Sequence, residues 1–209
     1  MHKKPETLLK NKILAILLLI GGFGFTTGLR SQSWEFVKEK DSIRIYIRPE
    51  KDSDLKSFKG EMTVLSSMER VNSLIGNVKN FDWWDDDIRG IKVLKYIPDS
   101  LIQYYLIYDV PWPFSDRDLC VEAHINTDPV SGVRTVYSVP LQGVVPESPD
   151  LVRIKNYWQK WVITPEGDGK IYLVLEGFAD PGGNVPSWLY NMVITNTPLK
   201  VMTRLRDHL

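Results

Sequence analysis

The chain has 209 residues, enough for one domain with a full hydrophobic core. Its formal net charge is zero, so the composition gives no support for a nucleic-acid partner. The single cysteine, Cys120, excludes an internal disulfide, and the three scattered histidines provide no zinc-ligand spacing. We therefore expect neither a metal nor another cofactor.

Residues 1–33 are predicted to be an export signal. Lysines precede an uncharged apolar run over 13–29, and residues 31–33 (Ser-Gln-Ser) form a small-x-small triplet that suits cleavage before Trp34. The run is at the short limit for a membrane span, so an uncleaved membrane anchor is the alternative. We expect an exported protein, periplasmic or secreted, whose mature domain covers 34–209.

The domain begins with β-strand patterns. Apolar residues alternate with polar ones over 34–50, which predicts a hairpin, and 55–65 predicts a third strand. Ser66 or Ser67 can begin a helix that ends near Gly76. The further predicted strands are 88–97, 100–109, 117–127, 133–141, 151–163 and 170–178. Strands that follow one another without helices between them indicate an antiparallel sheet.

The C-terminal part changes to a helical pattern. Apolar side chains recur at helical spacing over 187–208, which predicts one long helix. Pro198 lies inside it and should remove the hydrogen bond to the carbonyl of Ile194, bending the helix there. The expected fold class is α+β, with a long antiparallel sheet that packs against this helix. If the sheet curves around the helix, a pocket can remain between them.

The segment "VPWPFSDRDLCV" (110–121) interrupts the strand pattern. Two prolines flank Trp112; they cannot donate to a strand ladder, so they should force a corner whose apolar surface the tryptophan covers. Arg117 lies between Asp116 and Asp118, and we expect these charges to satisfy one another and fix the chain between two strands. The alternative is that Arg117 contacts a ligand head group.

Three segments, in order, resemble the START family, the steroidogenic-acute-regulatory-protein-related lipid-transfer domains. They are "FDWWDDD" (81–87), "VPWPFSDRDLCV" and the C-terminal part from residue 151, which contains "DPGGNVPSW". The likeness covers about 34–209 and identifies the chain as an exported bacterial member. It implies a helix-grip fold, a curved antiparallel sheet around a long C-terminal helix that encloses an apolar tunnel. It also implies one lipid or sterol-like ligand, with structural roles for Trp84, Asp85, Arg117 and Asp118.

The resemblance also bears on the ligand. Family members that carry choline phospholipids have an arginine where this chain has Phe81, and aromatic residues where it has Leu106 and Leu119. Only Tyr157 matches a cage tyrosine. Because a quaternary ammonium needs aromatic faces and a phosphate needs an arginine, the pattern argues against phosphatidylcholine. It favours a less charged ligand, such as a sterol-like molecule or a fatty acid.

Ligand-facing side chains are predicted from strand and helix periodicity. On the strands, alternation places Tyr104, Leu106, Tyr108 and Leu119 inward. On the C-terminal helix the expected residues are Leu189, Met192, Val193, Asn196 and Leu199. Asn196, the polar residue of this face, can hydrogen-bond either a ligand hydroxyl or the sheet. The alternative is that all these residues pack a closed core.

We expect a monomer that binds and transfers a hydrophobic molecule, contacts membranes transiently and is not an enzyme. One alternative is a helix-grip enzyme of the cyclase or hydrolase type. Its acid–base candidate is His124, with Glu122 two residues away on the same strand face. The other alternative is a lipid sensor tethered to a membrane by the uncleaved N-terminal segment.

Overall fold

A computed structural model describes residues 33–78 and 83–209. The expected export signal and Phe81 lie outside these residues. No helix in the described part is long and apolar enough to cross a membrane.

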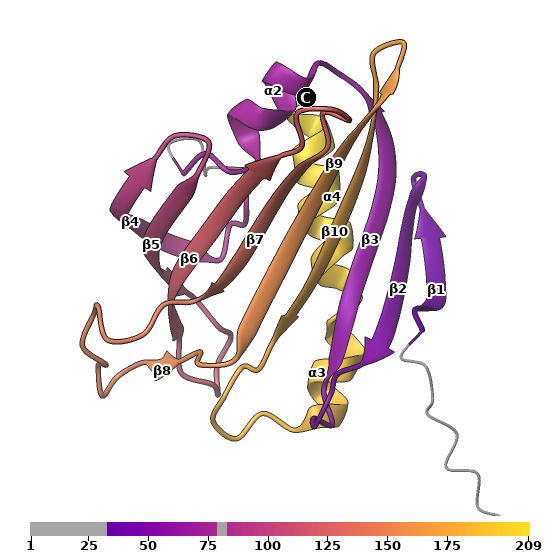
Figure 1. Ribbon diagram of the computed structural model, residues 1–209. Coiled ribbons are helices and arrows are strands. Elements are labelled where there is room, and N and C mark those ends of the chain that lie inside the picture. The colour runs from indigo at the N-terminus through magenta and orange to yellow at the C-terminus, as the bar shows by residue number, and fades with distance from the viewer. Residues whose placement is uncertain (1–32, 79–82) are drawn as a thin grey trace, which may run out of the picture. The chain divides into compact units, whose positions relative to one another are not determined.

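The described chain forms a ten-stranded sheet that curls around the C-terminal helices (Figure 1). Its order is β1-β2-β3-β10-β9-β7-β6-β5-β4, with β8 beside β6. The strands are β1 (Glu35–Lys40), β2 (Ile43–Pro49), β3 (Lys56–Leu65), β4 (Ile88–Ile97), β5 (Leu101–Tyr108), β6 (Arg117–Thr127), β7 (Arg134–Pro140), β8 (Val152–Arg153), β9 (Tyr157–Gly167) and β10 (Lys170–Ala179). All pairs on the main path are antiparallel, which confirms the fold predicted from the strand pattern.

The prediction of one strand over 151–163 was wrong. The segment contains the short strand β8 and the first part of β9. β8 runs parallel to β6, with Arg153 opposite Asp118. Two hydrogen bonds of 2.7 Å between these side chains hold β8 beside the first residues of β6. The chain therefore pairs briefly with β6 and then crosses to form β9.

The helix α2 (Met68–Leu74) begins where the sequence predicts. The hydroxyl of Ser67 accepts a hydrogen bond from the backbone N–H of Arg70 at 3.1 Å, an N-terminal cap. Val71 and Leu74 are buried on the side that faces the core. Gly76, with a φ of +78°, lets the chain turn after the helix.

The prediction of one long C-terminal helix was wrong in detail. The segment forms α3 (Ser187–Val193) and α4 (Asn196–Asp207), separated at residues 194–195. Pro198 lies in the first turn of α4, where a helix needs no backbone N–H donor. The proline therefore begins a second helix instead of bending a continuous one.

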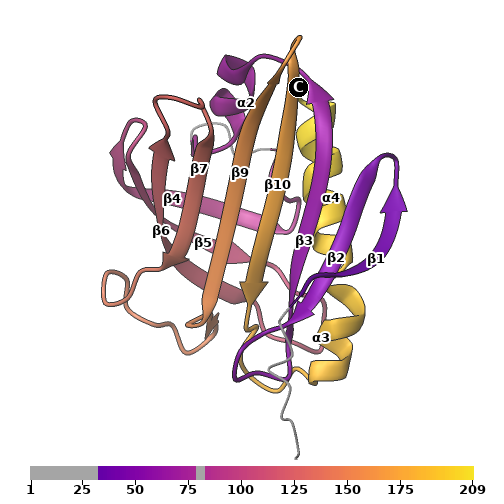
Figure 2. The same cartoon turned by 45° about the vertical axis from the view of Figure 1, so that its right-hand side comes forward.

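Helix α4 packs directly on the sheet. Its side chains Pro198, Met202 and Leu205 are buried. A Cβ atom at Gly60 of β3 would lie 2.5 Å from the sulfur of Met202 and 3.0 Å from Cβ of Pro198. Only glycine permits this approach, which brings the helix close to β2 and β3 while β4–β7 curve away from it (Figure 2).

Candidate ligand-binding site

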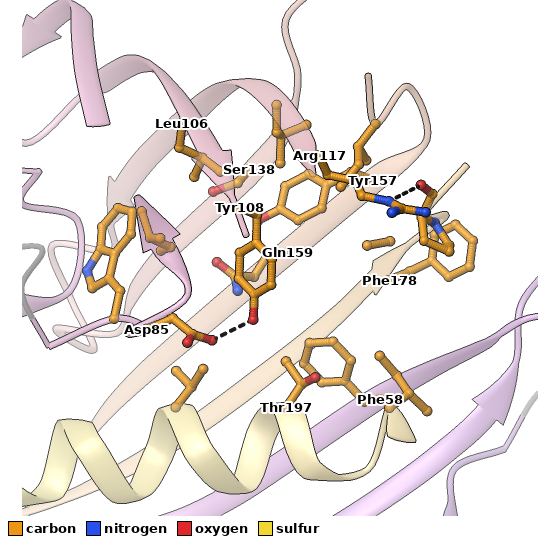
Figure 3. Close-up of a pocket in the computed structure, with 18 of the residues that line it drawn as sticks. Phe58, Asp85, Leu106, Tyr108, Arg117, Ser138, Tyr157, Gln159, Phe178 and Thr197 are labelled. Carbon is orange, nitrogen blue, oxygen red and sulfur yellow. Dashed lines mark hydrogen bonds between the residues drawn. The ribbon is translucent and has the colours of Figure 1, made fainter. Parts of the chain in front are cut away.

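A cavity of about 590 Å³ lies between the concave face of the sheet and helices α3 and α4 (Figure 3). This volume is typical of pockets that hold small organic ligands. Its walls come from β5, β6, β7, β9 and β10, and most of the lining side chains are aliphatic or aromatic. The site can therefore enclose an apolar molecule.

A row of residues across the sheet opens this space. Ala123 of β6 lies opposite Ser138 of β7, which lies opposite Gln159 of β9, which lies opposite Gly177 of β10. Three of the four side chains are small. The ring of Phe58 occupies the space over Gly177, where a Cβ atom would lie 2.6 Å from the ring. The cavity thus depends on the small side chains of Ala123 and Ser138, since larger ones would fill it, while Gly177 makes room for Phe58 in the cavity wall.

Neutral polar groups lie within this apolar wall. Ser138 and Gln159 form a cross-strand pair that lines the cavity, and Figure 3 shows the amide of Gln159 near its middle. Tyr104 and Tyr157 also line it, and burial raises the pKa of both phenols, so they stay protonated. These four side chains can offer hydrogen bonds without adding charge.

At one end of the cavity lies the acidic turn, which we define as residues 83–87. Oδ1 of Asp85 lies 2.6 Å from Nζ of Lys200, and the hydroxyl of Tyr108 donates a 2.9 Å hydrogen bond to Oδ2. Burial raises the pKa of Asp85, but Lys200, the backbone N–H of Asp87 and Tyr108 outweigh it and lower the pKa below its usual value. Asp85 is therefore ionised, and its charge is balanced by Lys200.

The rest of the acidic turn is attached to the same helix. Nζ of Lys200 also lies 3.0 Å from Asp87, and Nη1 of Arg204 lies 2.6 Å from Asp86. Nε of Arg204 donates a 2.7 Å hydrogen bond to the carbonyl of Trp83. Two cations one helical turn apart thus pair with three consecutive aspartates and hold the turn against α4.

Next to the acidic turn lies the corner, which we define as residues 109–118; the backbone N–H of Asp109 donates a 2.7 Å hydrogen bond to the carbonyl of Asp87. Arg117 donates to the backbone carbonyls of Ser115, Pro181 (3.1 Å) and Gly182 (3.5 Å). The bonds to Pro181 and Gly182 join the corner to the loop that precedes α3, and Figure 3 shows a hydrogen bond from the labelled Arg117 side chain. The hydrogen-bond partners of the Arg117 side chain are therefore backbone carbonyls of the corner and of this loop.

The predicted pairing of Arg117 with its neighbouring aspartates was wrong. Asp116 lies 3.1 Å from Arg89 and accepts a hydrogen bond from the backbone of Val110. Asp118, on the opposite strand face, forms the buried ion pair with Arg153. Asp118 follows Arg117 directly on β6 and therefore points to the opposite face, whereas Asp116 precedes the strand and is held by Arg89 and Val110.

The corner also forms the mouth of the cavity. Residues 110–112 and Phe114 line it on one side, and Pro181, Val185 and Leu189 line it on the other. Trp112, whose following peptide bond is cis, is 92% exposed. The prediction that Trp112 covers the corner was therefore wrong, because its indole extends into solvent at the rim.

The structure brings seven of the ten predicted ligand-facing residues to the cavity wall. They are Tyr104, Leu106, Tyr108, Leu119, Tyr157, Leu189 and Val193. Trp84 lines it too, with its ring 5.5 Å from that of Tyr104.

The placement of Met192, Asn196 and Leu199 was wrong, since none of them lines the cavity. Met192 is 62% exposed, and Asn196 accepts a hydrogen bond from Lys38 on the surface. Leu199 packs at the edge of the core. The break between α3 and α4 changes the helical phase, so Thr197 and Val201 take the inward positions.

Some lining residues were missed although the sequence contained a signal for them. Gln159 is two residues after Tyr157 on one strand, and Ser138 lies in a predicted strand whose inward face was not assigned. Alternation from Tyr157 would have identified Gln159. Phe58 and Phe178 depend on how β3 and β10 are paired, which the sequence does not state.

The acid–base candidates lie away from the cavity. Nε2 of His124 is 2.8 Å from Glu122, and Gln103 donates to the same carboxylate at 2.6 Å. Glu122 and His124 alternate along β6 with Ala123, which lines the cavity, so they occupy the outer face of the sheet. Their geometry gives no support to catalysis on a molecule in the cavity.

Comparisons with known proteins agree with this geometry. The family model described as "START domain" matches residues 26–209. Rat phosphatidylcholine transfer protein is 28% identical over 176 residues, covering 80% of this chain and 79% of that protein. An uncharacterised protein of Pseudomonas aeruginosa is 25% identical over 188 residues, covering 88% of this chain and 91% of that protein.

A solved structure is also similar. The crystal structure of a STAR-related lipid transfer protein fragment from Xanthomonas axonopodis has a TM-score of 0.76 and 27% identity. The alignment covers 84% of this chain and 97% of that one.

Proposed function

Since this chain belongs to the START domain family, we propose that it binds one lipid or similar hydrophobic molecule in the cavity and transfers it between membranes, without catalysis. The observation that carries the proposal is the apolar cavity of about 590 Å³ beneath the C-terminal helices. A closed core would have no such space, because protein interiors pack densely. The names of the rat and Xanthomonas relatives support lipid transfer as the activity.

The lining argues for a ligand other than phosphatidylcholine. Leu106 and Leu119 lie opposite each other on β5 and β6 and present aliphatic surface to the cavity. Of the positions that form the aromatic cage in choline-binding family members, only Tyr157 is aromatic here, and such cages bind a quaternary ammonium through several ring faces. The other aromatic side chains of the lining stand at different positions. The hydroxyls and the amide in mid-cavity suit a ligand with one or two neutral polar groups, as in a sterol-like molecule or the backbone of a simple lipid.

The rim of the cavity supports transient membrane contact. Trp112 at the corner and Trp188, Met192 and Val193 of α3 are exposed large apolar side chains, and Trp112 and Val193 also line the cavity. A tryptophan on a membrane-facing loop would lie at the interface between head groups and chains. We infer that this rim meets the bilayer surface while a ligand enters or leaves, and that the protein acts as an exported monomer.

The test is mass spectrometry of what the purified protein carries, under native conditions and after organic extraction. We expect one bound lipid or sterol-like mass per chain. Ala123→Phe should displace it, because the new ring would project into the cavity, whereas His124→Phe on the opposite face of β6 should retain it. An empty protein that also takes up no fluorescent lipid would contradict the proposal.

A second measurement determines whether the N-terminal segment is removed from the mature protein. Loss of about the first 33 residues in the mature protein would support a free exported carrier. Retention of those residues in a membrane fraction would support the tethered sensor instead.

A further inference from the structure

We propose that Arg117 binds the anionic head group of an amphiphilic lipid, a carboxylate or a phosphate, at the mouth of the cavity while the hydrocarbon chain lies inside. The proposal rests on the proposed function, because it assumes that the cavity holds a lipid. It adds the charge of the head group and the residue that selects it.

The first observation is that Arg117 is a buried cation. Its exposed fraction is 4%, and it lines the cavity beside Phe114, whose ring centre lies 5.8 Å from the guanidinium carbon. A charge removed from water is costly unless an opposite charge approaches it. Burial accordingly lowers the pKa of Arg117, although Asp116 at longer range opposes this effect.

The second observation is that no ion pair joins Arg117 to any described carboxylate. The two aspartates beside it in sequence pair with Arg89 and Arg153. The partners of Arg117 are three backbone carbonyls, which supply dipoles but no net negative charge. The side chain is therefore held in place while its charge remains without a counterion.

The third observation is that the guanidinium keeps free donors. It has five N–H groups, and the described bonds use one on each of its three nitrogens. One N–H remains on each terminal nitrogen. Two such donors form the fork that binds a carboxylate or a phosphate through paired hydrogen bonds.

The fourth observation is the asymmetry of charge around the cavity. Among the described lining residues, Asp85 and Arg117 carry the charges. Asp85 is already paired with Lys200, so among the described lining residues the charge of Arg117 is the one without an ionic partner. An anionic amphiphile would therefore place its head group at the corner, next to Arg117, and its chain among the apolar side chains of the interior (Figure 3).

The experiment compares ligands that differ only in head-group charge. Oleate and oleyl alcohol, delivered from cyclodextrin, are titrated into the purified protein by calorimetry. We expect the protein to bind oleate at least about tenfold more tightly, as a charge-assisted pair of hydrogen bonds in a desolvated site allows. Oleoyl lysophosphatidic acid forms a third arm, and the tighter of the two anions identifies the carboxylate or the phosphate as the natural head group.

The variants assign the preference to one side chain. Arg117→Gln should remove the preference for the anion, and Arg117→Lys should retain part of it. The control is Lys160→Gln, which makes the same change in net charge. Gln159 and Trp161 of β9 line the cavity, so Lys160 between them points to the outer face, and its substitution should leave the anion preference intact. If Arg117→Gln fails to fold, the wild-type comparison and Arg117→Lys still decide the question.

The outcomes separate the two proposals. Equal affinity of the wild-type protein for oleyl alcohol and both anions would overturn the role of Arg117 and leave lipid binding in place. An anion preference that survives in a folded Arg117→Gln variant would overturn it as well. If the protein binds none of the probes and carries no lipid of its own, the proposed function fails and the inference fails with it.

Discussion

The acidic turn and the corner are both dense in charge, and a backbone hydrogen bond from Asp109 to Asp87 joins them, yet their charges are arranged differently. In the acidic turn, Lys200 and Arg204 of α4 pair with all three aspartates. In the corner, the aspartates pair with Arg89 of β4 and Arg153 of β8, and Arg117 is left with carbonyl partners. Pairing across elements is typical of a structural contact, whereas an unpaired buried charge at a cavity is typical of a binding site.

The largest expected effect comes from the ion pair behind the corner. Asp118→Asn would leave Arg153 buried without its carboxylate, and Tyr105 would lose a charged acceptor at 3.1 Å. We expect the free energy of unfolding to fall by about 3–5 kcal/mol, the usual result of breaking a buried pair. Urea unfolding measures this change.

The matched control for Asp118→Asn is Arg89→Gln. Arg89 is 52% exposed and pairs with Asp109 and Asp116 near the surface. We expect a loss of less than about 1 kcal/mol there, since water screens exposed pairs. Equal losses in the two variants would show that burial does not determine the value of these pairs.

The next effect concerns the acidic turn. Lys200→Gln removes the cation that lies near both Asp85 and Asp87. We expect a loss of about 1–2 kcal/mol, between the values for exposed and buried pairs, because Lys200 is 40% exposed whereas Asp85 is mostly covered. Lys160→Gln serves as the control on the outer face. If Lys200→Gln and Lys160→Gln lower the free energy of unfolding equally, Lys200 does not attach the acidic turn to α4.

A pH series tests the same contact. The pKa of Asp85 is lower in the folded protein than its ordinary value of 3.8, so its ionised form stabilises the fold above about pH 4. This stabilisation is lost as the pH falls through the lower folded value. The stability difference between the wild type and Asp85→Asn should therefore be greatest near neutral pH and shrink below pH 4. A difference that stays constant down to pH 2.5 would contradict the pairing.

The smallest effect on stability is expected at the rim of the cavity. Trp112→Ala removes a side chain that is 92% exposed, so the free energy of unfolding should change by less than about 0.5 kcal/mol. Lipid transfer between vesicles should slow several-fold, because the indole no longer enters the membrane interface. Val130→Ala, also highly exposed but outside the cavity lining, is the control. An unchanged transfer rate in the Trp112→Ala variant would contradict the proposal that the corner contacts the membrane.

Much of the fold could be predicted from local patterns. Alternation placed Tyr104, Leu106 and Tyr108 on one face of β5, and they do share the cavity wall. Ser67 indicated the start of α2. Such predictions succeed because side-chain period and capping depend on residues close in sequence.

The errors arose where partners come from distant parts of the chain. The apolar spacing over residues 187–208 was interpreted as one helix bent at Pro198, but the structure has two helices. The predicted helical phase was therefore wrong for α4, and it placed Asn196 and Leu199 inward. The pairing of Arg117 with Asp116 and Asp118 was inferred from adjacency, but Asp118 points to the opposite face of β6 and Asp116 precedes the strand.

The sequence by itself determined most of the strands, the corner at the two prolines and the family to which the chain belongs, because each depends on a local pattern. Only the tertiary structure decided which arginine meets which aspartate and which helix face lines the cavity. An ion pair depends on the distance between elements far apart in the chain, and a cavity depends on what neighbouring strands leave unfilled. The unpaired charge of Arg117 belongs to this second kind of information, since Arg89 and Arg153 reach its neighbouring aspartates only in the folded protein.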